Sequence, residues 1–183
     1  PAATIFLALT LLCGIVYPYV VTGFGKLAWS GQAAGSLVVH DGKAIGSMLI
    51  GQAFTSPGHF WGRPSATAPM PNNAAGSGGS NLGPSNPALV DAVKARIAAL
   101  RQADPGNLAP VPVDLVTASA SGLDPDISLA AARYQAGRVA RARGLDPARV
   151  QALIDGQAAR PLLGFLGEPK VNVLALNLAL ESL

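Results

Sequence analysis

The sequence predicts an α+β protein with one N-terminal transmembrane helix followed by a loop-rich mixed α/β soluble domain. Three observations carry this prediction. All 13 Lys and Arg and all 10 Asp and Glu lie at or after position 26, so the head of the chain is uncharged. The chain has 21 glycines and 15 prolines, above the usual shares of about 7% and 5%. One hairpin signal followed by several helix signals lies in the charged part. We therefore expect a transmembrane helix at 1–25, a linker at 26–35 and a soluble domain at 36–183.

The uncharged segment from Ala2 to Phe24 has the length and composition of a membrane-spanning helix. At about 1.5 Å per residue it spans about 34 Å, enough to cross a hydrocarbon core of about 30 Å. Pro18 removes one backbone donor, which predicts a kink near Tyr17. Lys26 is placed to reach the headgroups at the end of the span.

Three alternatives compete with a membrane helix, and each fits the residues less well. A cleaved signal peptide usually has a shorter apolar core, of about 7–15 residues, and Gly23-Phe24-Gly25 is a poor cleavage site. A lipoprotein anchor at Cys13 would want a small residue before it, where Leu12 stands. A buried helix of a soluble core would rarely lack charge over such a length. The membrane helix is favoured, and the residues alone leave its topology open.

The start of the soluble part reads as a hairpin. The mostly apolar runs 37–40 and 43–45 flank the turn pair Asp41-Gly42, which favours a type I′ turn because both central residues need positive φ. Residues 47–50 extend the second strand toward Gln52 in this interpretation. The stretch from Phe54 to Pro87 is rich in Gly, Pro, Ser and Asn, so it is either a flexible linker or a loop held by aromatic anchors such as Trp61.

The rest of the chain predicts helices separated by turns. Asn86-Pro87 opens the first helix as N-cap and N1, and residues 111–116 read as a short strand. The second helix begins near Ser128 and ends before Gly144, and the third runs from Asp146-Pro147 to Gly156. The tail at 171–180 alternates like a strand, but its Leu and Ala content and Asn172 as a cap favour a helix.

The second of these helices is rich in arginine. At about 100° per residue, Arg138 and Arg141 fall opposite the apolar arc, and Gln135 lies at its border. A solvated face, with cations suited to the helix C-terminus, is the favoured interpretation. Binding of an anion or nucleotide, and docking to an acidic partner, remain as alternatives.

Few residues are suited to catalysis. With two histidines, His40 and His59, and one cysteine, the chain predicts no catalytic or metal site. Gly42-Lys43 is followed by Ala44, so it is no P-loop. A net charge of +3 gives no reason to expect nucleic acid. A Ser–His–Asp site with His59 as its base is the remaining hydrolase hypothesis.

Several motifs along the chain point to one family. They are Tyr17-Pro18, GSMLIGQAF at 46–54, GRPSAT at 62–67, SGGSNL at 77–82, SNP at 85–87, VPVDLVTASASGLD at 111–124, RVARARGL at 138–145 and VNVLALNLAL at 171–180. Together they cover nearly the whole chain, and they resemble the C subunit of the bacterial Kdp potassium-transporting P-type ATPase.

The resemblance implies an accessory, non-catalytic subunit of an ATP-driven, high-affinity potassium uptake pump in the bacterial inner membrane. Its partners would be the lipid bilayer, a channel-like potassium-binding subunit that handles K⁺, and a P-type ATPase subunit that holds the hydrolytic site. The family is described as a catalytic chaperone that raises the ATP affinity of the ATPase subunit, so ATP is expected only through that partner. The soluble domain is expected on the extracytoplasmic face.

The resemblance also implies site residues. Gln135 resembles the family glutamine discussed as a nucleotide contact, and Arg138 accompanies it in the alternative of a membrane-tethered nucleotide- or anion-binding module. A rigid Ser/Asn/Gly loop is expected to contact partner subunits. The candidate interface residues are Tyr17, Pro18, Arg63, Ser65, Thr67, Ser77, Gly78, Gly79, Ser80, Asn81, Ser85 and Asn86.

Overall fold

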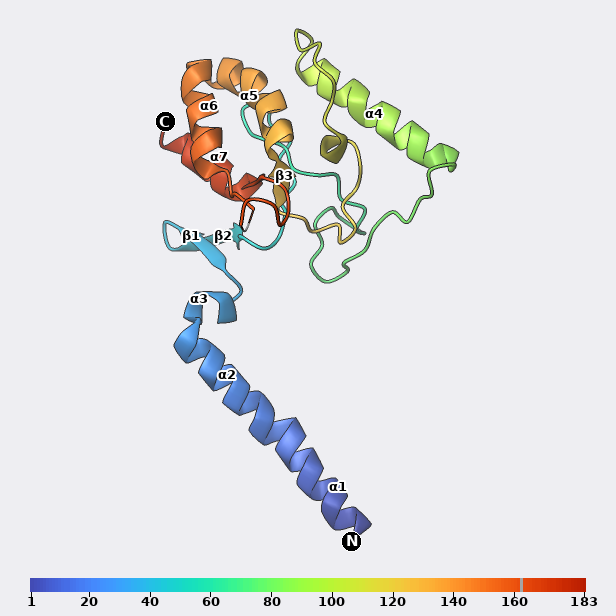
Figure 1. Ribbon diagram of the computed structural model, residues 1–183, viewed down its shortest axis with the longest axis vertical. Helices are drawn as coiled ribbons and strands as arrows, with labels where there is room; N and C mark the ends of the chain where they lie inside the picture. Colours follow the sequence, from blue (N-terminus) through green and yellow to red (C-terminus); the bar gives the residue numbers. More distant parts are fainter. Residues whose placement is uncertain (162) are drawn as a thin grey trace. The chain divides into compact units, whose positions relative to one another are not determined.

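The computed structural model describes residues 1–161 and 163–183, and it confirms the mixed α+β class. These residues form helices and two small two-stranded sheets (Figure 1). They divide into two compact units, Pro1–Ser47 and Met48–Leu183. The hairpin at 37–47, which we expected in the soluble domain, belongs to the first unit together with the N-terminal apolar helix.

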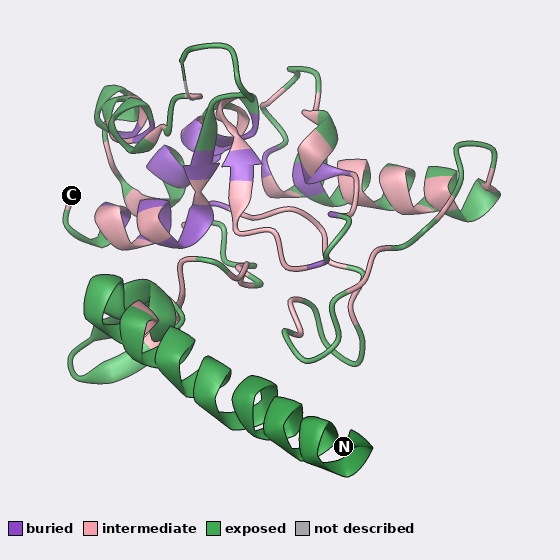
Figure 2. Ribbon diagram, turned by 60° about the horizontal axis from the view of Figure 1, so that its bottom comes forward, coloured by how far each residue is buried: buried purple, intermediate pink, exposed green. Residues whose placement is uncertain are grey.

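The N-terminal unit begins with one long apolar helix. It consists of α1 (Ala2–Leu11), a π-helical segment (Leu12–Val16) and α2 (Tyr17–Ala28). The span Ala2–Ala28 has a mean hydropathy of 2.1 and contains no buried residue, as Figure 2 shows, so its length and composition suit a membrane crossing. The π-helical segment ends directly before Tyr17-Pro18, because Pro18 cannot donate the next hydrogen bond of a regular α-helix. A local departure from regular α-helix therefore lies just before Tyr17, and the kink itself stays a prediction.

The expected hairpin follows a short helix, α3 (Ser30–Ala33), in the predicted linker. Strands β1 (Leu37–His40) and β2 (Lys43–Ser47) pair antiparallel, with a register shift after Val38. Asp41 and Gly42 have φ of 50° and 75°, as a type I′ turn requires. The predicted extension of the second strand is present up to Ser47 and is wrong beyond it, because the chain turns directly after β2.

The second unit contains the remaining elements. They are α4 (Pro87–Ala103), a 3₁₀ turn η2 (Val113–Leu115), β3 (Asp126–Ser128), α5 (Leu129–Arg143), α6 (Pro147–Gln157), β4 (Lys170–Asn172) and α7 (Val173–Glu181). Strands β3 and β4 pair antiparallel, with Ile127 opposite Val171. Helices α5, α6 and α7 pack beside this short sheet (Figure 1).

The helix starts are fixed by local side-chain caps, as the sequence predicts. The side chains of Asn86, Ser128, Asp146 and Asn172 each accept a hydrogen bond from a backbone N–H in the first turn of the helix that follows. Gly144 ends α5 in the left-handed conformation, with φ of 66°. The tail forms a helix, so the preference for helix over strand is confirmed.

The strand predicted at 111–116 is wrong. The segment instead forms η2, and Pro110 and Pro112 before it cannot donate to a neighbouring strand. Leu115 and Val116 at its end are buried in the core. Apolar residues in this short run therefore mark a buried turn and not a ladder.

The core of the second unit gathers around α5. Its fully buried side chains include Val139, Val150, Ile154 and Leu176. Phe60, which lies far from these helices in sequence, is also completely buried. A phenyl ring in the core removes about 150–250 Å² from water, so it anchors the long loop that carries it to the helices.

Candidate functional site

The long loop Gly51–Asn86 is the most distinctive feature of the second unit. None of its residues, all of which the structure describes, forms a helix or strand. The loop is tied down along its length by buried and polar contacts, described below, so the flexible-linker interpretation is wrong. Loops of this length with fixed anchors commonly carry function.

Two buried amide side chains hold the loop at Phe60 and Trp61. The Phe60 N–H donates to Asn177 Oδ1 at 2.8 Å, and Asn177 Nδ2 donates to Phe60 O at 3.0 Å. The Trp61 N–H donates to Gln135 Oε1 at 2.8 Å, and Gln135 Nε2 donates to Trp61 O at 3.1 Å. Asn177 lies on α7 and Gln135 on α5, and both are almost fully buried.

Arg138 lies between this pair and the preceding turn. Its guanidinium donates to Pro57 O, to His59 O at 3.0 Å and to Gln135 Oε1 at 2.7 Å. It also lies 4.3 Å from the centre of the Trp61 ring, a cation–π contact. Burial lowers the pKa of Arg138 to about 10, so the side chain stays cationic at neutral pH.

The prediction that Arg138 lies on a solvated face is wrong, because only 4% of the residue is exposed. The helical wheel considers α5 alone, and here the loop covers the side opposite the core helices. Gln135, predicted at the border of the apolar arc, is 1% exposed for the same reason.

The other arginines of α5 also have partners. Arg143 Nε donates to Gly58 O at 2.6 Å, which adds a further tie to the loop. Arg141, more than half exposed, pairs with the buried carboxylate of Asp104. Arg133 pairs with Asp155 at 2.9 Å. The exposed arginines are thus solvated as predicted, but each is also engaged with a protein group.

Two hydroxyl groups organise the middle of the loop. Ser65 Oγ donates to Gly122 O at 2.7 Å and accepts from the Asn72 N–H at 2.9 Å. Thr67 Oγ1 donates to Met70 O at 2.8 Å and accepts from the Asn73 N–H at 3.0 Å. The hydroxyls of these two predicted interface residues therefore shape the turn that presents Met70, which is 60% exposed.

The glycine-rich part of the loop runs against residues 120–122. The Gly78 N–H and Ser77 Oγ both donate to Ser121 O, at 2.9 and 3.0 Å. A Cβ on Gly79 would lie 2.9 Å from Ala120 O, closer than real Cβ atoms approach. Glycine is required there because two backbones approach closely.

The remaining candidates are scattered. Ser80, Asn81 and Ser85 are exposed on the loop, and Asn86 caps α4. Tyr17 and Pro18 belong to the N-terminal unit, on the exposed face of the apolar helix. The structure therefore gathers most, but not all, of the predicted interface residues on one loop.

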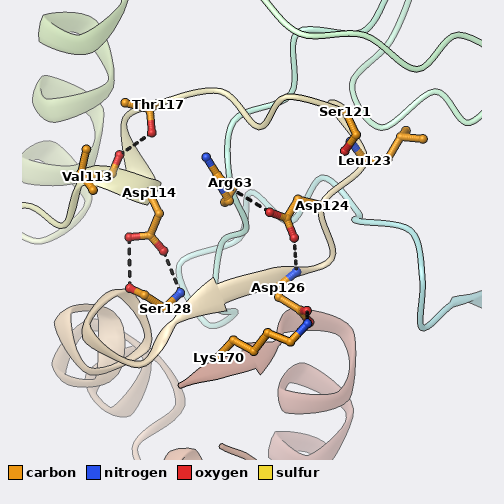
Figure 3. A network of polar contacts seen from close by, with 10 residues as sticks. All are labelled: Arg63, Val113, Asp114, Thr117, Ser121, Leu123, Asp124, Asp126, Ser128 and Lys170. Carbon is orange, nitrogen blue, oxygen red and sulfur yellow. Dashed lines mark hydrogen bonds and ion pairs between the residues drawn. The ribbon is translucent and has the colours of Figure 1, made fainter. Parts of the chain in front are cut away.

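Arg63 connects the loop to a polar network around β3 and β4 (Figure 3). Its guanidinium lies 3.0 Å from Asp124 Oδ2, and Asp124 Oδ1 accepts from the Asp126 N–H at 3.1 Å. Lys170 Nζ in turn donates to Asp126 Oδ2 at 2.5 Å. Sequence reasoning missed these carboxylates, and the Gly-Leu-Asp-Pro turn was the available signal. Among the described residues no cluster of His, Cys, Asp or Glu is suited to hold a metal ion.

The part of the loop after Arg63 is also free of charge, and we call it the charge-free loop. No Asp, Glu, Lys or Arg occurs between Arg63 and Asp91. Ala66, Pro69, Met70 and Pro71 are exposed at its turn. Depletion of charge and enrichment of Met are typical of the cores of protein interfaces.

The described part of the chain has one helix suited to a membrane crossing and a small domain with an anchored, charge-free loop. This architecture is that of a single-span, membrane-associated protein. A family model described as "KdpC: K+-transporting ATPase, c chain" matches residues 1–182. The chain belongs to this KdpC family, so the resemblance seen in the sequence is confirmed.

Similar proteins cover almost the same length. A protein of Methylibium petroleiphilum is 69% identical over 177 residues, covering 97% of this chain and 93% of the relative. One from Herminiimonas arsenicoxydans is 66% identical over 181 residues, covering 99% of this chain and 95% of the relative. One from Burkholderia orbicola is 60% identical over 182 residues, covering 100% of this chain and 94% of the relative. Each is named a potassium-transporting ATPase KdpC subunit.

Proposed function

We propose that this chain is a non-catalytic accessory subunit of an ATP-driven, high-affinity potassium uptake pump, and that it assists assembly and the coupling of ATP to K⁺ transport. The family match over residues 1–182 carries this proposal. Hydrolysis and ion handling are assigned to a P-type ATPase subunit and a channel-like potassium-binding subunit. If the chain purified alone hydrolysed ATP at the rate of a pump, the proposal would fail.

The proposed position is the bacterial inner membrane, with the Ala2–Ala28 helix in the bilayer and the second unit on the extracytoplasmic side. The helix is uncharged up to Lys26, which supports its insertion. Protease treatment of intact spheroplasts and of inverted vesicles tests the orientation. We expect cleavage of the second unit in spheroplasts, and cleavage only in inverted vesicles would reverse the assignment.

The proposed docking surface is the charge-free loop around Met70, with Ser80, Asn81 and Ser85 further along it. Its support is the exposure of apolar side chains on a turn that Ser65 and Thr67 hold in place. A surface fixed before binding loses less conformational entropy when it docks.

A second proposal is a nucleotide- or anion-binding role through Gln135 and Arg138, with the cationic guanidinium as its support. Their polar atoms already bond to Trp61, Pro57 and His59, so a nucleotide would first have to displace the loop. Titration of the chain with ATP separates the two proposals. Micromolar binding that Gln135→Ala abolishes would favour this second role.

A further inference from the structure

The side-chain amides of Gln135 and Asn177 form the same hydrogen-bond pattern with the loop that a neighbouring β-strand would form. In an antiparallel sheet, a hydrogen-bonded residue pair exchanges two N–H···O=C bonds. Here each side-chain amide exchanges the same two bonds with one loop residue, Asn177 with Phe60 and Gln135 with Trp61. Two successive loop residues are thus paired as in a sheet, but by side chains from two different helices.

Arg138 completes this arrangement. Gln135 Oε1 accepts from both the Trp61 N–H and Arg138, so the amide is held with its oxygen toward the cation. The same guanidinium donates hydrogen bonds to the carbonyls of Pro57 and His59 at the start of the turn. The Trp61 indole lies against it and donates through Nε1 to Ser56 O at 2.9 Å. The loop from Ser56 to Trp61 is therefore bonded at almost every residue.

The polar atoms of Gln135 are committed to this arrangement. Its oxygen accepts two hydrogen bonds, and its nitrogen donates to Trp61 O and, at 3.3 Å, to Ala131 O. Removing the amide leaves the part-buried N–H and C=O of Trp61 without partners, which opens the loop locally. Loss of Asn177 does the same to Phe60, one residue away.

We propose that Gln135, Arg138 and Asn177 are positioning residues that fix the path of the loop and so present its charge-free turn to the other pump subunits. The second clause rests on the proposed docking function. In this account, substitution of Gln135 weakens the pump through the loop, and Asn177, which lies on another helix, has the same role.

The test compares Gln135→Ala and Asn177→Ala in the detergent-solubilised full chain, with Gln102→Ala on the exposed face of α4 as the matched control. A Trp29→Phe background leaves Trp61 as the only tryptophan. We expect both variants to shift the Trp61 emission and to accelerate amide exchange at residues 60 and 61 on the order of tenfold or more. Gln102→Ala should change neither signal.

The variant Gln135→Glu distinguishes loss of the specific loop contacts from general misfolding of the domain. It keeps the acceptor for the Trp61 N–H and for Arg138 but loses the donor to Trp61 O, so it should restore part of the Trp61 signal, whereas an added negative charge would repel a nucleotide phosphate. Unchanged Trp61 emission and exchange in both alanine variants would overturn the positioning role. Affinity purification of the alanine variants then tests docking. If the Trp61 signals change but the variants still recover the other pump subunits fully, the loop is positioned by these residues and does not dock.

Discussion

Asp114 holds the start of helix α5 from 14 residues away. Its Oδ2 accepts from the Ser128 N–H at 2.7 Å and its Oδ1 from Ser128 Oγ at 3.1 Å (Figure 3). Ser128 Oγ in turn caps the helix by accepting from the Ala131 N–H at 3.0 Å. A carboxylate near a helix N-terminus also interacts favourably with the helix dipole. The turn before β3 therefore helps to place the helix that carries Gln135 and Arg138.

Asp114→Ala is expected to lower the free energy of unfolding by about 1–3 kcal/mol, because it removes two hydrogen bonds to a charged group and leaves the Ser128 N–H unpaired. Chemical denaturation measures this. The control is Asp91→Ala on the exposed side of α4, which should stay within about 0.5 kcal/mol of the parent protein.

Gly122→Ala is expected to destabilise the second unit more than Gly144→Ala. The two glycines have nearly equal φ, 68° and 66°, so the left-handed strain of about 1–2 kcal/mol is shared. A Cβ at Gly122 would also lie 2.5 Å from Thr67 Cγ2 and 2.7 Å from Gly78 O, whereas a Cβ at Gly144 meets no described atom within 4 Å. Equal midpoints in thermal unfolding would contradict the close packing of the loop against this turn.

The stability of the second unit is expected to fall as pH decreases from 8 to 5, partly through His59. Burial lowers the pKa of His59, and the nearby Arg143 cation acts in the same direction. The unfolded chain then takes up a proton near pH 6.5 while the folded chain resists it, so the contribution present above that pH is lost below it. His59 stacks on Phe54, and His59→Phe should keep the stacking and flatten the pH dependence. A variant with the parent's slope would exclude His59 as the cause.

The features predicted correctly from the sequence depend on near neighbours in the chain. Asn86, Ser128, Asp146 and Asn172 begin helices because each cap bonds to a backbone N–H within three residues. The Asp41-Gly42 hairpin and the apolar span at the N-terminus are local in the same sense.

The errors arise where distant segments meet. Arg138 was placed in solvent because helical periodicity does not include the loop from Pro57 to Trp61, about 80 residues earlier in the chain. The run at 111–116 forms a buried turn because its prolines cannot donate backbone hydrogen bonds to a neighbouring strand. Its last two side chains, Leu115 and Val116, are buried in the core. The network of Arg63 with Asp124 was missed because its members come from separate turns.

We propose that the charge-free loop docks this chain onto the other subunits of the pump. Affinity purification through a tag on this chain, comparing Met70→Asp with Leu108→Asp, tests it directly. Both residues are exposed, 60% and 93%, and both changes place a charge on the surface, but Leu108 lies outside the charge-free loop. We expect Met70→Asp to reduce recovery of the potassium-binding and ATPase subunits by about tenfold or more, and Leu108→Asp to leave it unchanged. Full recovery of both subunits with Met70→Asp would contradict docking through this loop.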